Sequence, residues 1–263
     1  MNETQTYKRK SLIITGLGAF LATLDSSIVN VSLPTISNEL STTMNMSGWV
    51  MISYSIVIVS LLMVFSALAE KKGFAFLYSN GFVIFLIGSL LCGISTSINF
   101  LISSRVIQGI GAAMLMACGP ALITKSFPAS ERGRGLSIIT MIVSVGLMTG
   151  PPLGGFIIGL FGWRWIFLIN IPVCLFGLFF TLKYLRGFPI INPDRKISIQ
   201  ASIALIATFI SIMITFLIFT RDSAYSEFKY IFLSCSILLI GLFIYFERNP
   251  KTQLIGFDIY KNR

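Results

Sequence analysis

The chain has 263 residues, of which 55% are apolar and only 11% are charged, against about 25% charged residues in soluble domains. Its mean hydropathy of +0.85 indicates more apolar surface than the core of a soluble protein can bury. The sequence contains no histidine and only ten acids, which excludes a histidine-based metal site and any histidine-dependent catalytic triad within this chain. The net charge of +10 is spread between long apolar runs, so nucleic acid is not an expected partner. The composition indicates a membrane protein, and neither an enzyme nor a cofactor is expected.

Long stretches without charge predict eight membrane-spanning helices and an all-α polytopic fold. A span needs about twenty mostly apolar residues. The lysines and arginine at 8–10 precede the first apolar run, as they would in a signal peptide. That run is too long for a signal peptide, contains Asp25 and lacks a small-x-small cleavage site, so an uncleaved helix is expected. The predicted spans are 12–32, 49–69, 75–96, 100–123, 136–160, 165–183, 199–220 and 230–246.

The distribution of basic residues predicts the orientation of these helices. If the amino terminus is cytoplasmic, sixteen of the twenty lysines and arginines fall on the inner side, as the positive-inside rule requires. Both termini are then cytoplasmic, in the plasma or inner membrane. The tryptophans fall at predicted outer ends, where indole rings favour the interface, and the cysteines lie inside apolar runs, where they are expected to be packing residues. These residues are Trp49, Trp163, Trp165, Cys92, Cys118, Cys174 and Cys235.

Two charges lie well within predicted spans, Asp25 in the first and Arg105 in the fourth. At 1.5 Å per residue, Asp25 lies about 10 Å and Arg105 roughly 8 Å from the outer face. Opposite charges at matching depth could pair, or compete for a proton whose binding alters the pairing, which is a transport chemistry. Alternatively, Asp25 marks a wet helix end together with Ser26, Ser27 and Asn30, and Arg105 snorkels to lipid headgroups. The positions alone do not separate these two interpretations.

Small and polar residues on the fourth and fifth spans predict faces that pack against protein. On the fourth span, Gln108 and Gly109 share a helical face with Arg105. On the fifth, glycines four residues apart open a groove for a second helix, and prolines beside them favour a kink. Plain helix packing is one interpretation of this pattern, and a moving element is the other. The residues of the fifth span are Gly146, Gly150, Pro151, Pro152, Gly154 and Gly155.

At these residues the sequence resembles the major facilitator superfamily, and within it the fourteen-helix drug:proton antiporters of the QacA/EmrB type. The matching segments are 24–34 with Asp25, 105–113 with Arg105, 146–155 with the glycines, and 163–172 at the fifth-to-sixth connection. The resemblance implies that Asp25 handles protons or substrate, that Arg105 takes part in proton transfer, and that the fifth-helix motif is the one characteristic of antiporters.

The connection between the second and third spans departs from the family pattern G-x-L-a-D-R-x-G-R-(R/K). Here it reads Ser66-Ala67-Leu68-Ala69-Glu70-Lys71-Lys72-Gly73-Phe74-Ala75. Glu70, Lys71 and Gly73 are the residues that keep the pattern, whereas the first glycine and the final basic pair are lost. In the family this loop latches the inner gate.

The resemblance covers the six helices of one bundle, expected over 1–190, and two linker helices with a cytoplasmic tail, expected over 191–263. The ninth family helix would begin where the chain ends. The expected function is that of the N-terminal half of a proton-coupled multidrug efflux transporter. Its expected partners are protons, a small amphipathic substrate, the lipid bilayer and a C-terminal six-helix half or a second copy. The alternatives are a truncated remnant that does not transport, or a membrane assembly partner, and the chain alone is expected to insert without transporting.

Overall fold

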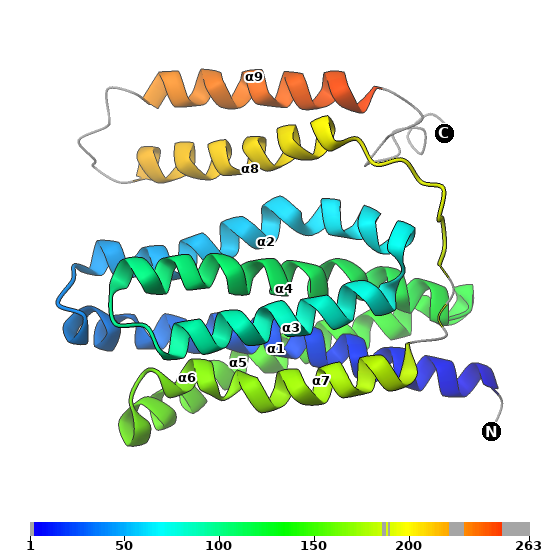
Figure 1. Ribbon diagram of the computed structural model, residues 1–263, viewed down its shortest axis with the longest axis horizontal. Coiled ribbons are helices and arrows are strands. Elements are labelled where there is room, and N and C mark those ends of the chain that lie inside the picture. The colour runs from blue at the N-terminus through cyan, green and yellow to red at the C-terminus, as the bar shows by residue number, and fades with distance from the viewer. Residues whose placement is uncertain (1–2, 186–187, 189, 221–228, 249–263) are drawn as a thin grey trace.

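Hydrogen bonding of the backbone within each segment is what permits these apolar sequences to cross a membrane, and helices dominate the structure accordingly. A computed structural model describes residues 3–185, 188, 190–220 and 229–248. Within them, eight helical segments are long and apolar enough to cross a bilayer. The helices (Figure 1) are α1 (Glu3–Glu39), α2 (Met44–Lys72), α3 (Phe74–Gly93), α4 (Ile98–Ser126), the 3₁₀ turn η1 (Ala129–Glu131), α5 (Arg132–Phe161), α6 (Trp165–Leu168), α7 (Asn170–Tyr184), α8 (Ile199–Thr220) and α9 (Lys229–Glu247).

Short connections with local caps join successive helices. The hydroxyls of Thr43 and Ser97 accept hydrogen bonds from backbone N–H groups in the first turns of α2 and α4, both at 3.3 Å. Gly73 ends α2 and begins α3 with φ +93°, a backbone conformation that other residues rarely adopt. Because these turns are tight, neighbouring helices run antiparallel and their ends gather at two opposite ends of the bundle (Figure 1).

The first six spans form one bundle in which the strongest pairings join α3 with α4, α1 with α5 and α2 with α4. Two clusters of buried apolar side chains occupy the interior, one extending from Ile14 to Leu185 and the other centred on Ile28 and Trp163. The chain thus places α1 and α4 at the centre of the bundle, each with partners on several sides.

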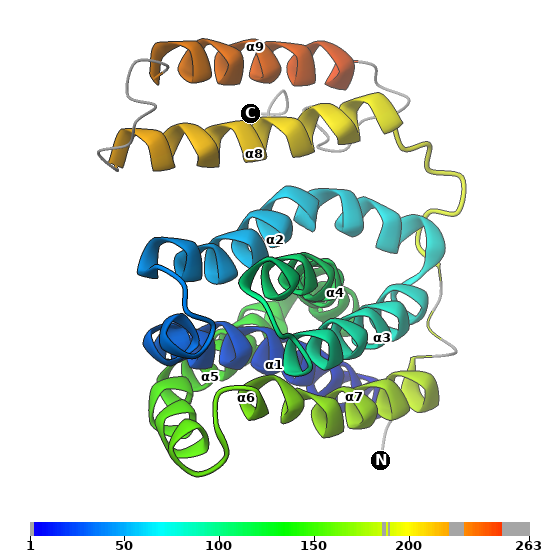
Figure 2. The same cartoon turned by 60° about the vertical axis from the view of Figure 1, so that its left-hand side comes forward.

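Helices α8 and α9 lie outside this bundle as a pair, beside α2 (Figures 1 and 2). Helix α8 packs on α2 through a small cluster that includes Ala67, Ala201 and Leu205, and α9 packs on α8. Hydroxyls support the α8–α9 contact, since Ser211 and Thr215 each lie within 3.0 Å of the Ser236 hydroxyl.

The expected sixth span is confirmed over Trp165–Tyr184, with a one-residue break at Ile169 that divides it into α6 and α7. Other expectations from the sequence need correction. Trp163 is not an interfacial residue, because its side chain is completely buried and its Nε1 donates to Glu39 at 2.9 Å. Cys235 is exposed on α9 and does not pack within the bundle, unlike the three buried cysteines. The expected cytoplasmic tail after α9 lies outside the described residues.

Candidate functional site

The centre of the bundle holds an ion pair between α1 and α4. One guanidinium nitrogen of Arg105, Nη1, lies 2.5 Å from Oδ2 of Asp25, and both side chains have no solvent exposure. The matching depths expected from the sequence therefore correspond to a direct contact, and the headgroup-snorkelling alternative does not describe this structure. A buried pair of this kind costs several kcal/mol per ion to desolvate, so it persists only with further hydrogen bonds.

Amide side chains supply those further hydrogen bonds. The Asp25 Oδ1 atom accepts from Nδ2 of Asn170 at 2.7 Å and from Nε2 of Gln108 at 2.9 Å. Gln108 also accepts from Nη1 of Arg105 through its Oε1 at 2.5 Å and donates to the Ser89 hydroxyl at 2.8 Å. The carboxylate thus accepts hydrogen bonds from three side chains, two on α4 and one on α7.

Aromatic rings and a backbone carbonyl enclose the guanidinium. The Arg105 Cζ atom lies 3.9 Å from the ring centroid of Tyr54 and 5.7 Å from that of Phe167. Its Nε donates to the Val50 carbonyl at 3.1 Å, while Nη2 has no hydrogen-bond partner within the described part of the chain. The Tyr54 hydroxyl in turn donates to the Ala22 carbonyl at 3.1 Å. A movement of Arg105 would therefore change its contacts with Val50 and Tyr54 on α2, and the Tyr54 hydroxyl connects α2 to α1.

Sequence reasoning gave the ion pair as one of two interpretations and singled out Gln108, but it missed Tyr54, Ser89 and Asn170 as partners of the pair. Asn170 lies in the segment that resembles the family's fifth-to-sixth connection, so its polarity in an apolar run was an available signal. Ser89 and Tyr54 carried no such signal, because single hydroxyls are common in membrane helices.

The glycines of α5 form the contact with α1. A Cβ at Gly150 would overlap the Ser27 side chain and come within 3.0 Å of the Ile28 nitrogen, and one at Gly154 would meet Ile28 at 3.3 Å. Gly146 faces Thr23 in the same way, so the three glycines lie along one packing line. Helix α5 runs without interruption through both prolines.

Three predicted residues take no part in this contact. Asn30, Pro151 and Gly155 are exposed, and a Cβ at Gly155 would meet no atom within 4 Å. By contrast, Gly109 packs closely against α2, where a Cβ would lie 3.1 Å from the Tyr54 carbonyl oxygen. Close approach of α3 to α4 also depends on glycine, since a Cβ at Gly88 would come within 2.6 Å of Gln108 atoms.

The predicted gate loop between α2 and α3 is tied to the segment that leads to α8. The Glu70 carboxylate forms an ion pair with Arg195, and its carbonyl accepts from the backbone N–H of Asn192 at 3.0 Å. Lys71 is half-buried at the last turn of α2, and Gly73 forms the turn itself. Within the described residues, the acidic residue of this loop therefore contacts the linker segment.

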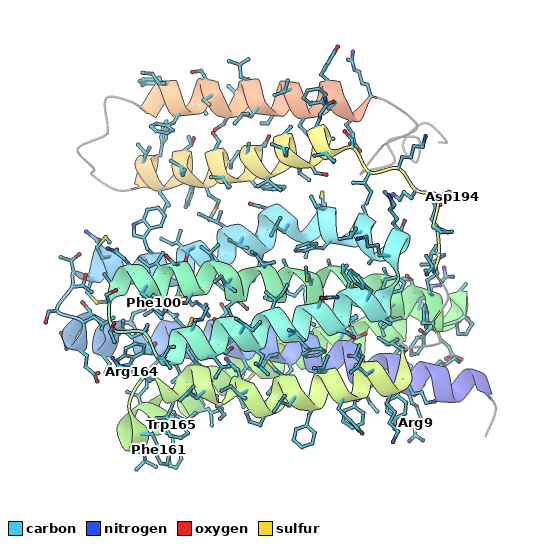
Figure 3. The ribbon with its side chains drawn as sticks, in the orientation of Figure 1. Arg9, Phe100, Phe161, Arg164, Trp165 and Asp194 are labelled. Atoms are coloured by element: carbon cyan, nitrogen blue, oxygen red, sulfur yellow. The ribbon has the colours of Figure 1, made fainter. Side chains whose placement is uncertain are left out.

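At the opposite end of the bundle, the α5–α6 connection is fastened to the end of α1. The Arg164 guanidinium pairs with Glu39 at 3.3 Å and donates to the Ser95 carbonyl at 3.1 Å, and Trp163 shares the same Glu39 oxygen. Figure 3 places Arg164 at this end, near Trp165 and Phe161. The connector from 162 to 170 is thus attached to α1 near both of its ends. Trp163 and Arg164 bind Glu39, and Asn170 binds Asp25.

A small cavity of about 210 Å³ adjoins the Tyr54 ring. Helices α1, α2, α4 and α5 contribute apolar side chains and a few hydroxyls to its wall, and no charged side chain among the described residues lines it. The lining residues are Ala22, Thr23, Ser26, Tyr54, Ser55, Ile58, Val59, Met116 and Leu147.

A multi-pass helical bundle with a hydrogen-bonded ion pair at membrane depth has the features of a secondary transporter. The chain belongs to the Major Facilitator Superfamily, which it matches over residues 15–247.

Curated relatives and solved structures agree with this assignment. The chain is 40% identical over 185 residues to the riboflavin transporter RibZ of Clostridioides difficile, covering 70% of this chain and 40% of the relative. It is 40% identical over 187 residues to the multidrug resistance protein Stp of Mycobacterium tuberculosis, covering 71% and 34%. The human organic anion transporter MFSD10 shares the fold with a TM-score of 0.59 at 15% identity, over 78% of this chain and 55% of that one. The matched segment spans about two fifths of the curated relatives' length.

The contact from Asn170 to Asp25 predicts a measurable stabilisation. Asn170→Leu removes a donor from a buried carboxylate, which costs roughly 1.5–3 kcal/mol for a hydrogen bond to a charged group. We expect the variant to unfold at lower temperature in detergent, as followed by circular dichroism. The control is Asn80→Leu, because the Asn80 amide donates only to the Phe76 carbonyl of its own helix. Equal unfolding temperatures for the two variants would contradict the stabilising role.

Proposed function

We propose that this chain forms the N-terminal half of a proton-coupled exporter of small amphipathic compounds, set in the plasma membrane with both termini in the cytoplasm. The observation that carries the proposal is the buried contact of 2.5 Å between Asp25 and Arg105. A carboxylate at membrane depth can bind and release a proton only when a path to water opens, which makes its protonation dependent on conformation.

The network around the pair suggests how a proton and a conformation are linked. Protonation of Asp25 removes the charge that balances Arg105, and leaves the guanidinium with Gln108, the Val50 carbonyl and the Tyr54 ring. An unbalanced charge in an apolar interior is unfavourable by several kcal/mol, so the bundle gains free energy by rearranging until Arg105 finds water or a new partner. The protonated and charged states of Asp25 therefore favour different arrangements of α1 and α4.

The proposed substrate class follows from the cavity beside Tyr54. Its wall combines apolar side chains with the hydroxyls of Thr23, Ser26 and Ser55, which suits an amphipathic or aromatic molecule. In transporters built from two parallel repeats, the substrate lies between the repeats near the bilayer midplane. We place this cavity on the N-terminal wall of such a site, with the opposite wall supplied by a second six-helix bundle, either a C-terminal half or another copy. The relatives that carry the names riboflavin transporter and multidrug resistance protein are compatible with substrates of this kind.

The test is efflux of a fluorescent cationic dye from cells that lack their own exporters, with the protein level verified by an epitope tag. We expect the 263 residues alone to insert without transporting, and the same residues joined to a C-terminal half from a fourteen-helix relative to transport in response to an imposed proton gradient. Robust efflux by the chain alone as a monomer would refute the need for a second bundle. Absence of gradient-driven efflux from the joined protein, correctly inserted, would favour the non-transporting alternative.

A further inference from the structure

A second cavity lies at the other end of α1, remote from the ion pair and unused by the proposed function. It has a volume of about 450 Å³, within the range of small-molecule sites. The start of α1, the end of α4, the turn η1 and the first turns of α5 form its wall. Its lining residues are Lys8, Arg9, Leu12, Phe127, Glu131, Arg134 and Ile138.

The charges of this cavity are unbalanced. Lys8 pairs with Glu131 at 2.7 Å, and Glu131 is the only acid among the described residues that line the wall. Arg9 and Arg134 are exposed and form no ion pair within the described part of the chain. Figure 3 places Arg9 at the edge of the molecule, on the first turns of α1. The cavity therefore presents two guanidinium groups to a ligand, and guanidinium groups bind phosphate oxygens well.

The apolar residues Leu12 and Ile138 lie on the membrane side of these cations. Leu12 is one turn along α1 from Lys8, and Ile138 is one turn along α5 from Arg134, about 6 Å deeper in each case. Both belong to segments apolar enough to span the bilayer. The buried Phe127 ring lies at the level of the cations, with its centroid 5.8 Å from the Lys8 ammonium. The cations thus lie at the level of headgroups, and Leu12 and Ile138 at the level where acyl chains begin.

We propose that this cavity binds an anionic phospholipid, with the phosphate held by Arg9 and Arg134 and the first acyl carbons against Leu12 and Ile138. A free phosphate would satisfy the cations but leave the apolar part of the cavity uncovered, whereas a phospholipid matches both parts. Basic pockets between membrane helices bind lipid headgroups through the same combination of charge and position. The proposal is independent of transport, since it requires only the folded bundle.

The experiment uses the purified 263-residue chain in detergent and counts bound phosphatidylglycerol by native mass spectrometry. We expect the double variant Arg9→Gln/Arg134→Gln to bind phosphatidylglycerol roughly tenfold more weakly, since each arginine near the membrane surface contributes to such binding. The double variant Arg9→Lys/Arg134→Lys should keep most of the binding because it keeps both charges. Arg134→Glu, which adds repulsion of the phosphate, should lose at least as much as the double glutamine variant.

The matched control is Lys72→Gln/Lys183→Gln, which removes two cations from the same end of the bundle outside this cavity. It should bind phosphatidylglycerol as the parent does. Equal losses in both double glutamine variants would mean unspecific attraction and would overturn the proposal. Displacement of the lipid by millimolar inorganic phosphate would identify a soluble-anion site, and equal binding of zwitterionic phosphatidylcholine would show that the arginines do not select the headgroup; either result refutes it.

Discussion

In the chain joined to a C-terminal half, as proposed above, Asp25→Asn is expected to reduce dye efflux driven by a proton gradient to the background of cells without a transporter. Asparagine keeps the shape of the side chain but cannot bind and release a proton, so the proposed coupling is lost. The control is Asp194→Asn, the same chemical change at an exposed acid in the linker segment (Figure 3). Efflux should be measured at matched expression, and parental efflux by the Asp25 variant would show that the coupling acid is elsewhere.

Asp25→Asn is also expected to lower the stability of the fold, because it leaves the Arg105 charge unbalanced. This loss of stability has to be separated from a loss of transport. Removing one partner of a buried pair costs about 3–5 kcal/mol because it leaves an unbalanced buried charge, whereas replacing both partners by neutral side chains leaves no such charge. The double variant Asp25→Asn/Arg105→Gln should therefore unfold at nearly the parental temperature and still fail to transport. Recovery of transport in this double variant would show that the pair contributes stability alone.

Gly150→Leu is expected to prevent α5 from docking on α1. The new side chain would occupy the position of Ser27 and approach the Ile28 backbone, which cannot move without displacing α1. Overpacking of this kind costs typically 1–3 kcal/mol. Here it would also push α5 away from α1, which α5 approaches closely at Gly146, Gly150 and Gly154. Thermal unfolding of the purified chain, followed by circular dichroism, should show a large decrease in midpoint.

Gly155→Leu is the matched control, because a Cβ at this position, one residue beyond Gly154, meets no atom within 4 Å and Gly155 is exposed. Leu147→Ala is a second control, since the Leu147 side chain is half exposed while its backbone carbonyl accepts from Ser27 at 2.7 Å. Both controls should unfold close to the parental temperature. Similar midpoints for Gly150→Leu and Gly155→Leu would mean that close packing at Gly150 is not required.

The sequence was sufficient to locate the spans and the two charges within them, but not to decide whether those charges pair, because spans and intramembrane charges each depend on a single strong signal. A charge within an apolar run is costly enough that Asp25 and Arg105 stand out, and their depths follow from helix rise alone. Which side chains contact the pair depends on how each helix is rotated about its own axis. The surfaces of α3 and α7 are almost uniformly apolar, so their sequences do not predict this rotation. Asn170 therefore appeared as part of a motif, and its contact with Asp25 required the structure.

Trp163 shows a second limit of prediction from the sequence. Its position at a predicted outer end favoured the lipid interface, yet its indole donates a hydrogen bond within the protein to Glu39, which lies at the end of α1. The break between α6 and α7 was also not predicted, although Pro172 lies in the first turn of α7. Proline lacks the backbone N–H that a helix interior needs and is tolerated at a helix start, so this residue was an available signal. Gly155 differs from Gly154 by a rotation of about 100° about the helix axis, which separates a packed position from an open one.

The central pair joins residues that are made at very different times during translation. Asp25 precedes Arg105 by 80 residues and Asn170 by 145. At about 5–20 residues per second, the ribosome reaches Arg105 roughly 4–16 s after Asp25. During this interval the first helix carries a carboxylate without its partner, which costs roughly 2.5–3.5 kcal/mol at the centre of an inserted helix. This cost disfavours release of α1 into lipid before α4 is made, so α1 is expected to remain beside the insertion machinery until α4 arrives and the two helices can be released together.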